Sequence, residues 1–299
     1  RELVEERRWI SETRFLHALN YCMLLPGPEA MQLATYIGWL LHRGIGGLAA
    51  GIFFVLPGAV LLWFLAWVYI AWGTIPLIAG LFYGIKPAVL AVVMDACWRV
   101  GNKTLRRPSS LLLAATAFSA LYFLALPFPL VILGAGMIGV MGARFLPGQF
   151  VPPVASVTTS RSHVILDDQS SPPAHAALSW RRSMGVFVLW GSLWIIPIIL
   201  LAWWRGPDDL LTREAVFFSQ AAMVTFGGAY AVLSYLAQQA VEHYAWLNAD
   251  QMVDGLGLAE TTPGPLIMVT QFVGFIAAYQ HITDMPPLLA GTLGALITT

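Results

Sequence analysis

The sequence predicts an all-α, polytopic transmembrane helical bundle of two homologous halves, with helices broken at Pro-Gly-Pro. Hydrophobic residues make up 58% of the chain and charged residues 11%. In soluble domains roughly 45–50% of residues are apolar and about 25% are charged. Several apolar runs approach ~20 residues, the length that crosses a hydrocarbon layer of ~30 Å. One apolar pattern also occurs twice, and each copy is interrupted by the same Pro-Gly-Pro tripeptide.

The composition also excludes several functional classes. The formal net charge is zero, so there is no general basic field to attract nucleic acid. Cys22 and Cys97 lie in apolar runs and have neither metal-ligand spacing nor a disulfide framework. The six histidines are scattered, and no phosphate-binding glycine loop or catalytic triad context is present. We therefore expect no enzyme, no cofactor and no metal site, and we expect the lipid bilayer as the main surroundings.

The first half is expected to contain a surface helix, an interrupted segment and four spans. The amphipathic residues 1–14 are typical of a helix lying on a membrane. Residues 15–42 are apolar but carry the first Pro-Gly-Pro. The four predicted spans are residues 46–72, 75–100, 109–126 and 129–145, the last two forming a hairpin.

The second half follows a linker and begins with two spans before the repeated elements. Residues 147–182 are rich in Pro and Ser and contain no long apolar run. Two spans (183–204 and 215–236), an amphipathic piece (238–253), a second interrupted segment (255–279) and an unfinished apolar stretch follow. We divide the chain into a first half (1–146), the linker (147–182) and a second half (183–299), and interpret it as cut at both ends.

Basic residues predict which side of the membrane the linker occupies. They cluster after the 75–100 span and again around the linker, with one hairpin of two spans between the clusters. Both clusters therefore lie on the same side, which is expected to be cytoplasmic because lysine and arginine are enriched there. The clusters are Arg99, Lys103, Arg106 and Arg107, and Arg144, Arg161, Arg181 and Arg182.

The internal repeat appears when the chain is shifted by 237 positions. Pro26-Gly27-Pro28 then falls on Pro263-Gly264-Pro265, and Trp9 falls on Trp246. Paired Gly/Pro-interrupted segments in corresponding places are the best pointer in a sequence to a transporter binding site. The two halves are inverted if residues 15–42 cross the membrane and parallel if they re-enter, and the residues alone leave both alternatives open.

The first Pro-Gly-Pro contains the first candidate binding residues. Pro28 suits the beginning of a helix, and Glu29 would then lie beside the free N–H groups of that helix end, which favour negative charge. Glu29 could merely complement the helix dipole, but an ionised carboxylate in an apolar segment is costly and is usually functional. The candidates here are Pro26, Gly27, Pro28, Glu29 and Gln32.

The second copy differs in chemistry. Leu266 replaces Glu29, so two identical sites are not expected. The hydroxyl groups of Thr261 and Thr262 could cap a helix or contact an oxyanion, and both alternatives remain open. Gly227 and Gly228 interrupt a span and suggest either close helix packing or a local opening with exposed N–H groups. The candidates here are Gly227, Gly228, Thr261, Thr262, Pro263, Gly264, Pro265 and Gln271.

Lys86 and Asp95 are charged residues within one predicted span. They are nine residues apart, about two and a half helical turns, so they do not face each other and each needs its own partner. Lys86 is the preferred cationic residue for an anion pathway. Gln32 and Gln271, each following a Pro-Gly-Pro, are weaker candidates, for which polar helix contacts are an equal alternative.

These motifs resemble those of the chromate ion transporter family. The first-half resemblance lies in Leu24-Leu25-Pro26-Gly27-Pro28-Glu29, Gln32 and Tyr36-Ile37-Gly38-Trp39. The second-half resemblance lies in Phe226-Gly227-Gly228-Ala229, Trp246-Leu247-Asn248, Thr262-Pro263-Gly264-Pro265 and Phe272-Val273-Gly274. The motifs occur in the right order and spacing over nearly the whole chain.

The resemblance implies a long-chain member with two halves in inverted orientation. It also implies chromate efflux across a bacterial inner membrane, giving chromate resistance and driven by the membrane potential or the proton motive force. Protons and a second copy of the chain, as a homodimer, are further expected partners. Transport of sulfate or another oxyanion, or a role as a non-transporting membrane scaffold or sensor, remain alternatives.

Overall fold

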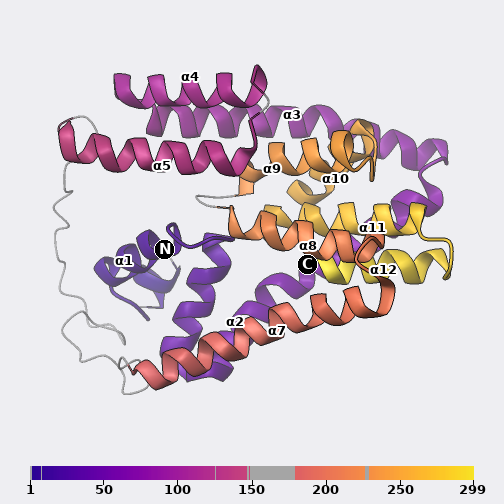
Figure 1. The fold of residues 1–299 in the computed structure, drawn as a ribbon, viewed down its shortest axis with the longest axis horizontal. Coiled ribbons are helices and arrows are strands. Elements are labelled where there is room, and N and C mark those ends of the chain that lie inside the picture. The colour runs from indigo at the N-terminus through magenta and orange to yellow at the C-terminus, as the bar shows by residue number, and fades with distance from the viewer. Residues whose placement is uncertain (1, 8, 125, 147, 149–178, 226–228) are drawn as a thin grey trace. The chain divides into compact units, whose positions relative to one another are not determined.

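The computed structural model describes residues 2–7, 9–124, 126–146, 148, 179–225 and 229–299 (Figure 1). Every element assigned in these ranges is a helix, eleven of them α-helices, which confirms the all-α prediction. The chain forms two compact units, residues 1–86 with 160–299 and residues 87–159. The predicted linker lies almost wholly outside the described residues, and the predicted half boundaries stay a prediction.

The N-terminal residues do not form the single surface helix expected for residues 1–14. A short π-helix, η1 (Glu2–Glu6), is followed by α1 (Glu12–Cys22). A new helix begins here because the Ser11 hydroxyl accepts a hydrogen bond of 3.2 Å from the Arg14 N–H and caps α1. The prediction of one continuous helix is therefore wrong.

The long helix α2 (Glu29–Trp72) reverses direction at His42 and Arg43, whose backbone angles are not helical. A Cβ on Gly46 would lie 2.2 Å from the Gly38 carbonyl oxygen. In one straight helix these two residues would be about 12 Å apart. The first arm of α2 (residues 29–41) therefore folds back on the second arm (residues 44–72), and the boundary predicted between residues 42 and 46 is confirmed.

The first arm is too short to cross a membrane alone. Its 13 residues span about 20 Å, whereas a hydrocarbon core needs ~30 Å. α1 packs against this arm, and the two helices bury Ala18, Cys22, Leu33 and Ile37 in one apolar cluster. Residues 12–41 thus form a short helical hairpin with the first Pro-Gly-Pro at its bend. The orientation of the two halves in the membrane stays a prediction.

The same order of elements recurs after residue 237. Asn248 caps the next short helix as Ser11 caps α1, and the two caps are 237 positions apart. A Cβ on Gly294 would lie 2.2 Å from the Gly274 carbonyl oxygen, which matches the contact of Gly46 with Gly38. The recurring elements are η3 (Gln238–His243), α10 (Ala249–Thr261), η4 (Leu266–Met268), α11 (Val269–His281) and α12 (Pro287–Thr298).

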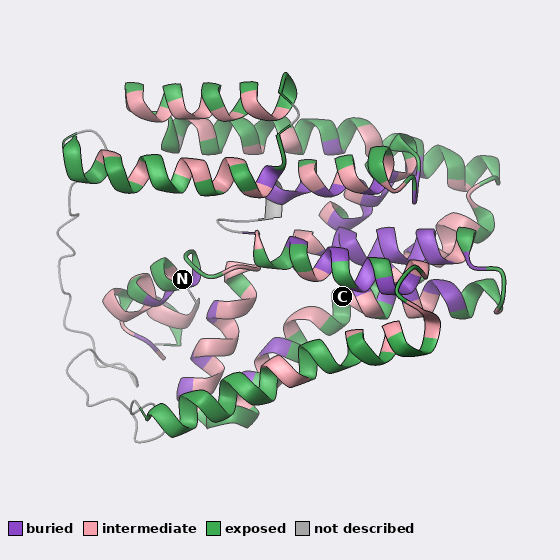
Figure 2. Ribbon diagram, viewed as in Figure 1, coloured by how far each residue is buried: buried purple, intermediate pink, exposed green. Residues whose placement is uncertain are grey.

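The core of the larger unit surrounds α11. Every residue of α11 from Val269 to Ala278 is buried, and Phe272 and Phe275 are completely covered (Figure 2). The helix packs against α2, α10, α12 and α8 (Leu210–Met223). Because α11 directly follows the second Pro-Gly-Pro, its burial fixes the position of that break.

The predicted span at residues 215–236 is not one helix. α8 begins earlier, where the Asp209 carboxylate accepts a hydrogen bond from the Leu211 N–H. It ends at Met223, and the Thr225 hydroxyl donates back to the Ala221 carbonyl over 2.7 Å. The chain resumes as α9 (Ala229–Ala237) after residues 226–228, which lie outside the described residues. The prediction of a continuous span is therefore wrong.

The remaining long helices present apolar side chains to their surroundings. Four of the described helices, α2, α3, α5 and α7, are long and apolar enough to cross a membrane. α7 has no buried residue, and Trp203 is 86% exposed. Such a surface suits a lipid environment rather than water. The bounds are α3 (Pro76–Thr104), α4 (Pro108–Tyr122), α5 (Phe128–Phe145) and α7 (Trp180–Arg205), close to the predicted spans.

A charged cluster joins the turn after α7 to the loop between α11 and α12. The Arg205 guanidinium lies 3.1 Å from the Asp209 carboxylate and donates to Asp284 over 3.1 Å. Asp209 also caps α8. One arginine therefore fixes the α7–α8 turn against the neighbouring loop.

The close crossing in α2 yields a stability prediction. We expect Gly46→Ala to lower the free energy of unfolding by about 1–3 kcal/mol, because the new Cβ would overlap the Gly38 carbonyl. The unfolding temperature of the purified protein in detergent measures this. Gly84→Ala is the matched control, since nothing lies within 4 Å of its Cβ position. Equal unfolding temperatures for Gly46→Ala and the control would contradict the reversal of α2.

The Asp284 contact yields a prediction about pH. Hydrogen bonds from Arg205 hold the pKa of Asp284 below its ordinary value. Such a group adds stability above the ordinary aspartate pKa of about 3.9 and loses it as the pH falls through the lower folded value. We expect Asp284→Asn to lower the unfolding temperature near neutral pH, and the deficit to shrink below about pH 4. A deficit that stays constant between pH 3 and 7 would contradict this.

Candidate functional site

The first Pro-Gly-Pro turn, Pro26-Gly27-Pro28, connects α1 to α2. Gly27 has a φ of 112°, a conformation that side chains with a Cβ rarely adopt. The Gln32 side-chain amide closes the turn by donating to the Pro26 carbonyl over 2.6 Å. Pro28 is the residue before the helix, and Glu29 is the first helical residue, as the sequence predicted.

The second Pro-Gly-Pro turn, Pro263-Gly264-Pro265, connects α10 to η4 and α11. Gly264 has a φ of 132°, so both turns depend on a glycine in the same region of backbone space. The Thr261 hydroxyl donates to the Gly257 carbonyl over 3.0 Å, and Thr262 donates to Ala259 over 3.2 Å. Both hydroxyl groups thus close the end of their own helix. A contact of either with an oxyanion stays a prediction.

Each turn is contacted by an element from the other half of the chain. The Gly27 N–H donates to the Thr225 carbonyl at the end of α8 over 2.8 Å. In return, a Cβ on Gly58 of α2 would lie 2.1 Å from the Pro263 carbonyl oxygen. The Gln271 amide adds a bond of 2.8 Å to the Ala59 carbonyl beside it. The two halves therefore interlock at their helix breaks.

The register of the α2 hairpin relates the two turns. Gly38 contacts Gly46, and Gly51 contacts Thr35 on the first arm. Continued at 1.5 Å per residue, this register brings Glu29 level with the region of Gly58. The first turn lies just before Glu29, and the second turn touches Gly58. Both breaks are therefore held at the same end of the hairpin.

Several buried polar atoms beside the turns have no hydrogen-bond partner. They are Oε1 of Gln32, Oγ1 of Thr35 and Oε1 of Gln271. Most buried polar groups in proteins are paired with protein or with ordered water, so an unpaired group calls for an explanation. Three such atoms beside two helix breaks are consistent with a polar site for water or a ligand.

The candidates Gly227 and Gly228 lie outside the described residues. The segments on either side of them are described and lie near the two turns. Thr225 contacts the first turn, and α9 packs against η4, which follows the second turn. The Gly-Gly segment thus connects two elements that each reach one of the breaks.

The structure does not bring Lys86 and Asp95 together. Asp95 pairs with Arg99 one turn further along α3, and its side chain is largely exposed. Lys86 instead contacts α10, where its ammonium group lies 3.1 Å from Asp250 and 3.5 Å from Asp254. Each charge therefore has its own partner, as the spacing predicted. A role for Lys86 in an anion pathway stays a prediction.

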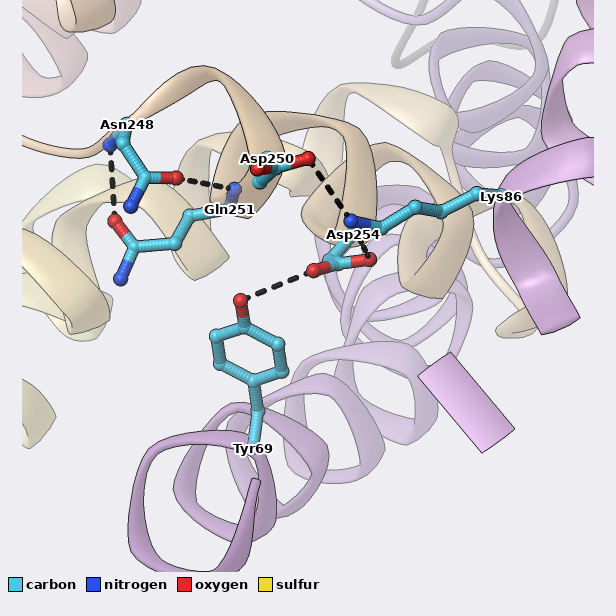
Figure 3. Close-up of polar contacts among 6 residues, drawn as sticks. All are labelled: Tyr69, Lys86, Asn248, Asp250, Gln251 and Asp254. Atoms are coloured by element: carbon cyan, nitrogen blue, oxygen red, sulfur yellow. Dashed lines mark hydrogen bonds and ion pairs between the residues drawn. The ribbon is translucent and has the colours of Figure 1, made fainter. Parts of the chain in front are cut away.

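Lys86 belongs to a polar cluster that joins three helices (Figure 3). The Tyr69 hydroxyl on α2 donates to Oδ2 of Asp254 over 3.0 Å. Oδ1 of Asp254 faces the Lys86 ammonium and accepts no hydrogen bond. Asp250 and Asp254 are four residues apart on α10, so they lie on one face of that helix. The cluster contains two carboxylates and one ammonium group.

A cleft of about 380 Å³ opens beside this cluster. Its walls come from the second arm of α2, the beginning of α3 and α10. Asp254 lies at the buried side of the cluster with only 7% of its side chain exposed, whereas the side chain of Asp250 is 86% exposed. The lining residues used below are Tyr69, Phe82, Lys86 and Asp254.

Three residues of this cluster were not predicted from the sequence: Tyr69, Asp250 and Asp254. Tyr69 lies in an apolar span and has no partner nearby in sequence. The two aspartates carried a usable signal, because an acidic pair at i and i+4 precedes the second Pro-Gly-Pro. Their partner Lys86 is 164 residues before Asp250, and that pairing is not visible in local patterns. No group of three or more potential metal-binding side chains occurs among the described residues.

The chain matches proteins whose names concern chromate. It is 29% identical over 282 residues to a probable chromate transport protein of Synechococcus elongatus, covering 93% of this chain and 63% of that protein. It is 27% identical to a chromate transport protein of Cupriavidus metallidurans, and the match covers 93% of this chain and 61% of that protein. It is 30% identical to a chromate transport protein of Pseudomonas aeruginosa, and the match covers 93% of this chain and 60% of that protein. Among solved structures, none matches this chain.

The chain spans less than two thirds of the length of each of these relatives. The chromate transporter family model matches residues 1–140 and 213–299, which include both Pro-Gly-Pro turns and the Lys86 cluster. Four helices of membrane-spanning length agree with a multi-pass membrane protein. Because the family model matches well over half of the residues, the chain belongs to the chromate transporter family.

Proposed function

We propose that the protein exports chromate across the bacterial inner membrane, and that the two Pro-Gly-Pro turns form the anion pathway. The observation that carries this proposal is the uncapped beginning of α2 at the first turn. No side chain caps this helix end, so its first N–H groups have no partner within the helix. Free N–H groups at a helix beginning attract anions, and an oxyanion offers several acceptor oxygens to them.

The family match and the interlocked turns support the same proposal. Helix breaks at membrane depth are tolerated where they are covered by protein or line a wet cavity. Both turns are covered by the opposite half, through Thr225 and Gly58. Glu29 lies at the helix end that the anion would use, so its charge would compete with the anion for the same N–H groups.

The direction of transport follows from charge. Chromate is largely a dianion near neutral pH, and the inside of a bacterial cell is electrically negative. Moving two negative charges outward gains roughly 4.6 kcal/mol at ~100 mV, from about 2.3 kcal/mol per charge. At about 1.4 kcal/mol per factor of ten, this supports a gradient of about a thousandfold. Export therefore needs no source of energy beyond the potential, and a proton gradient would add to it.

Another tetrahedral oxyanion such as sulfate remains the second candidate substrate. Backbone N–H groups recognise charge and oxygen geometry, and sulfate presents both in nearly the same shape. A non-transporting membrane scaffold or sensor is the candidate from another class. The same experiment separates all three functions.

Everted membrane vesicles containing the protein are expected to accumulate labelled chromate when a membrane potential is imposed. We expect Gly27→Ala and Gly58→Ala to lower the uptake rate about tenfold or more. The first strains a backbone at φ 112°, and the second pushes α2 away from Pro263. Such strain costs about 1–3 kcal/mol, and about 1.4 kcal/mol is a factor of ten. Uptake by equal amounts of membrane-inserted protein is the measurement.

Gly185→Ala in α7 is the matched control, because nothing lies within 4 Å of its Cβ position. Its uptake is expected to equal that of the unchanged protein. Unlabelled sulfate that competes better than unlabelled chromate would favour the second candidate substrate. Uptake no greater than in vesicles lacking the protein would leave the scaffold or sensor and refute transport.

A further inference from the structure

The Lys86 cluster contains two carboxylates but only one ammonium group, so one negative charge is not balanced within the cluster. The Lys86 ammonium is shared between Asp250 at 3.1 Å and Asp254 at 3.5 Å. Both carboxylates compete for this one positive charge. Asp250 is well exposed and can be stabilised by water, whereas Asp254 is nine-tenths buried. Asp254 is therefore the carboxylate whose charge depends on Lys86.

The two oxygens of Asp254 have different surroundings. Oδ2 accepts the hydrogen bond from the Tyr69 hydroxyl. Oδ1 is buried and accepts no hydrogen bond, although it faces Lys86 and its residue lines the cleft. A buried carboxylate oxygen without a donor is costly in its charged form. Oδ1 is therefore the atom at which a proton would bind.

The groups that face Asp254 from the packed elements are few. They are Tyr69 on α2, Lys86 on α3 and Asp250 on its own helix. α11 also packs against α10, and there it presents the apolar ring of Phe272 to Gly255. Phe82 covers Tyr69 edge-on with ring centroids 4.9 Å apart. Asp250 is therefore the other carboxylate among these groups, and its side chain is 86% exposed to solvent.

We propose that Asp254 is a proton-binding site and that the proton and the Lys86 ammonium compete for its Oδ1 atom. A proton delivered by hydronium through the cleft binds Oδ1, and water leaves. Lys86 keeps its own proton and remains paired with Asp250. Tyr69 still donates to Oδ2, so the neutral acid stays hydrogen-bonded. Loss of the proton reverses each of these steps.

A proton fits this site better than the other small ligands. An oxyanion would meet two carboxylates and a single ammonium, so the charge of the cluster is unfavourable. A metal ion would need more acidic or histidine ligands than this cluster has, and the described residues contain no suitable group. A single proton neutralises the one surplus charge and needs no further ligand.

The site is physically connected to the second Pro-Gly-Pro turn. Tyr69 and Gly58 both lie on the second arm of α2, and Gly58 contacts Pro263. Asp254 lies on α10, the helix that ends immediately before the same turn. The two helices that meet at the proton site therefore also meet at the turn. Resting on the proposed function, this arrangement would couple proton binding to movement of the anion.

The proton site is present once in the chain. With the shift of 237 positions, Asp254 falls on His17, which is exposed in α1. Asp250 falls on Thr13, which has no charge. The first copy therefore lacks the acidic pair of α10.

Infrared difference spectra of the purified protein, recorded between low and high pH, test the site without any transported ion. We expect a protonated carboxyl band from Asp254 in the unchanged protein and its loss in Asp254→Asn, whereas a band from the buried Glu214 would be the same in both proteins. The surface variant Asp208→Asn is the matched control and is expected to keep the band unchanged. Asp250→Asn is expected to confine the band to lower pH, because Lys86 would then pair with Asp254 alone. Tyr69→Phe is expected to shift it, because the hydrogen bond to Oδ2 is removed. Lys86→Met is expected to keep the band to higher pH, because the competing ammonium is gone.

Flux in proteoliposomes tests the coupling. With the membrane potential clamped at zero, a vesicle interior one pH unit more acidic than the outside is expected to raise labelled chromate accumulation about tenfold for each proton exchanged, because one pH unit is a tenfold ratio of proton concentration. Asp254→Asn is expected to lose this response. A gradient that leaves accumulation by the unchanged protein unaltered would overturn the coupling.

The two experiments keep this proposal separate from the proposed function. Spectra that are the same in the unchanged protein and in Asp254→Asn, or an Asp254 band whose titration moves with Na⁺ concentration, would overturn the proton site. A band that behaves as expected, in a protein that transports no oxyanion, would support the proton site and refute the transport function instead.

Discussion

A helix that stops in the middle of a hydrocarbon layer leaves N–H and C=O groups that water cannot reach. In the proposed transporter both Pro-Gly-Pro turns would create this condition, and the described elements of the larger unit pack around the two turns. Gly27 and Gly264 take up the left-handed backbone, Gln32 and the two threonines pair carbonyl groups near the breaks, and elements of the opposite half cover each turn. Because each turn is also contacted by an element of the opposite half, the two halves pack against each other at their helix breaks.

Duplication explains the architecture, and divergence explains the chemistry. The caps at Ser11 and Asn248, the two left-handed glycines and the two close glycine crossings occur in both copies. Glu29 at the first turn is replaced by Leu266 at the second, and Asp254 is replaced by His17 in the first copy. Backbone geometry is thus repeated while charge is not. The first turn therefore carries a single glutamate, whereas two aspartates and a lysine lie in one cluster on the helices that meet at the second turn.

Local patterns were sufficient to predict most of the fold. Apolar runs, glycine, proline and the cap residues act within a few positions, so the spans, the break at each Pro-Gly-Pro and the boundary near Arg43 could be predicted. Gly227 and Gly228 suggested an opening in the 215–236 span, but the end of α8 at Met223 could not be predicted, because the residues before that glycine pair are mostly apolar. The site was only half predicted. Its turn residues follow from sequence, whereas Lys86 meets Asp250 through tertiary packing across 164 residues.

The reversal of α2 has a mechanical consequence. The backbones of Gly38 and Gly46 are in direct contact, so the two arms cannot slide or bend independently and the hairpin behaves as a stiff lever. The bend of the hairpin lies at His42 and Arg43. Both Pro-Gly-Pro turns lie at the opposite, open end of the hairpin. A small rotation at the bend would displace the two turns by the same amount and at the same time. Both sides of the proposed pathway would then open and close together, because one rigid element moves both turns.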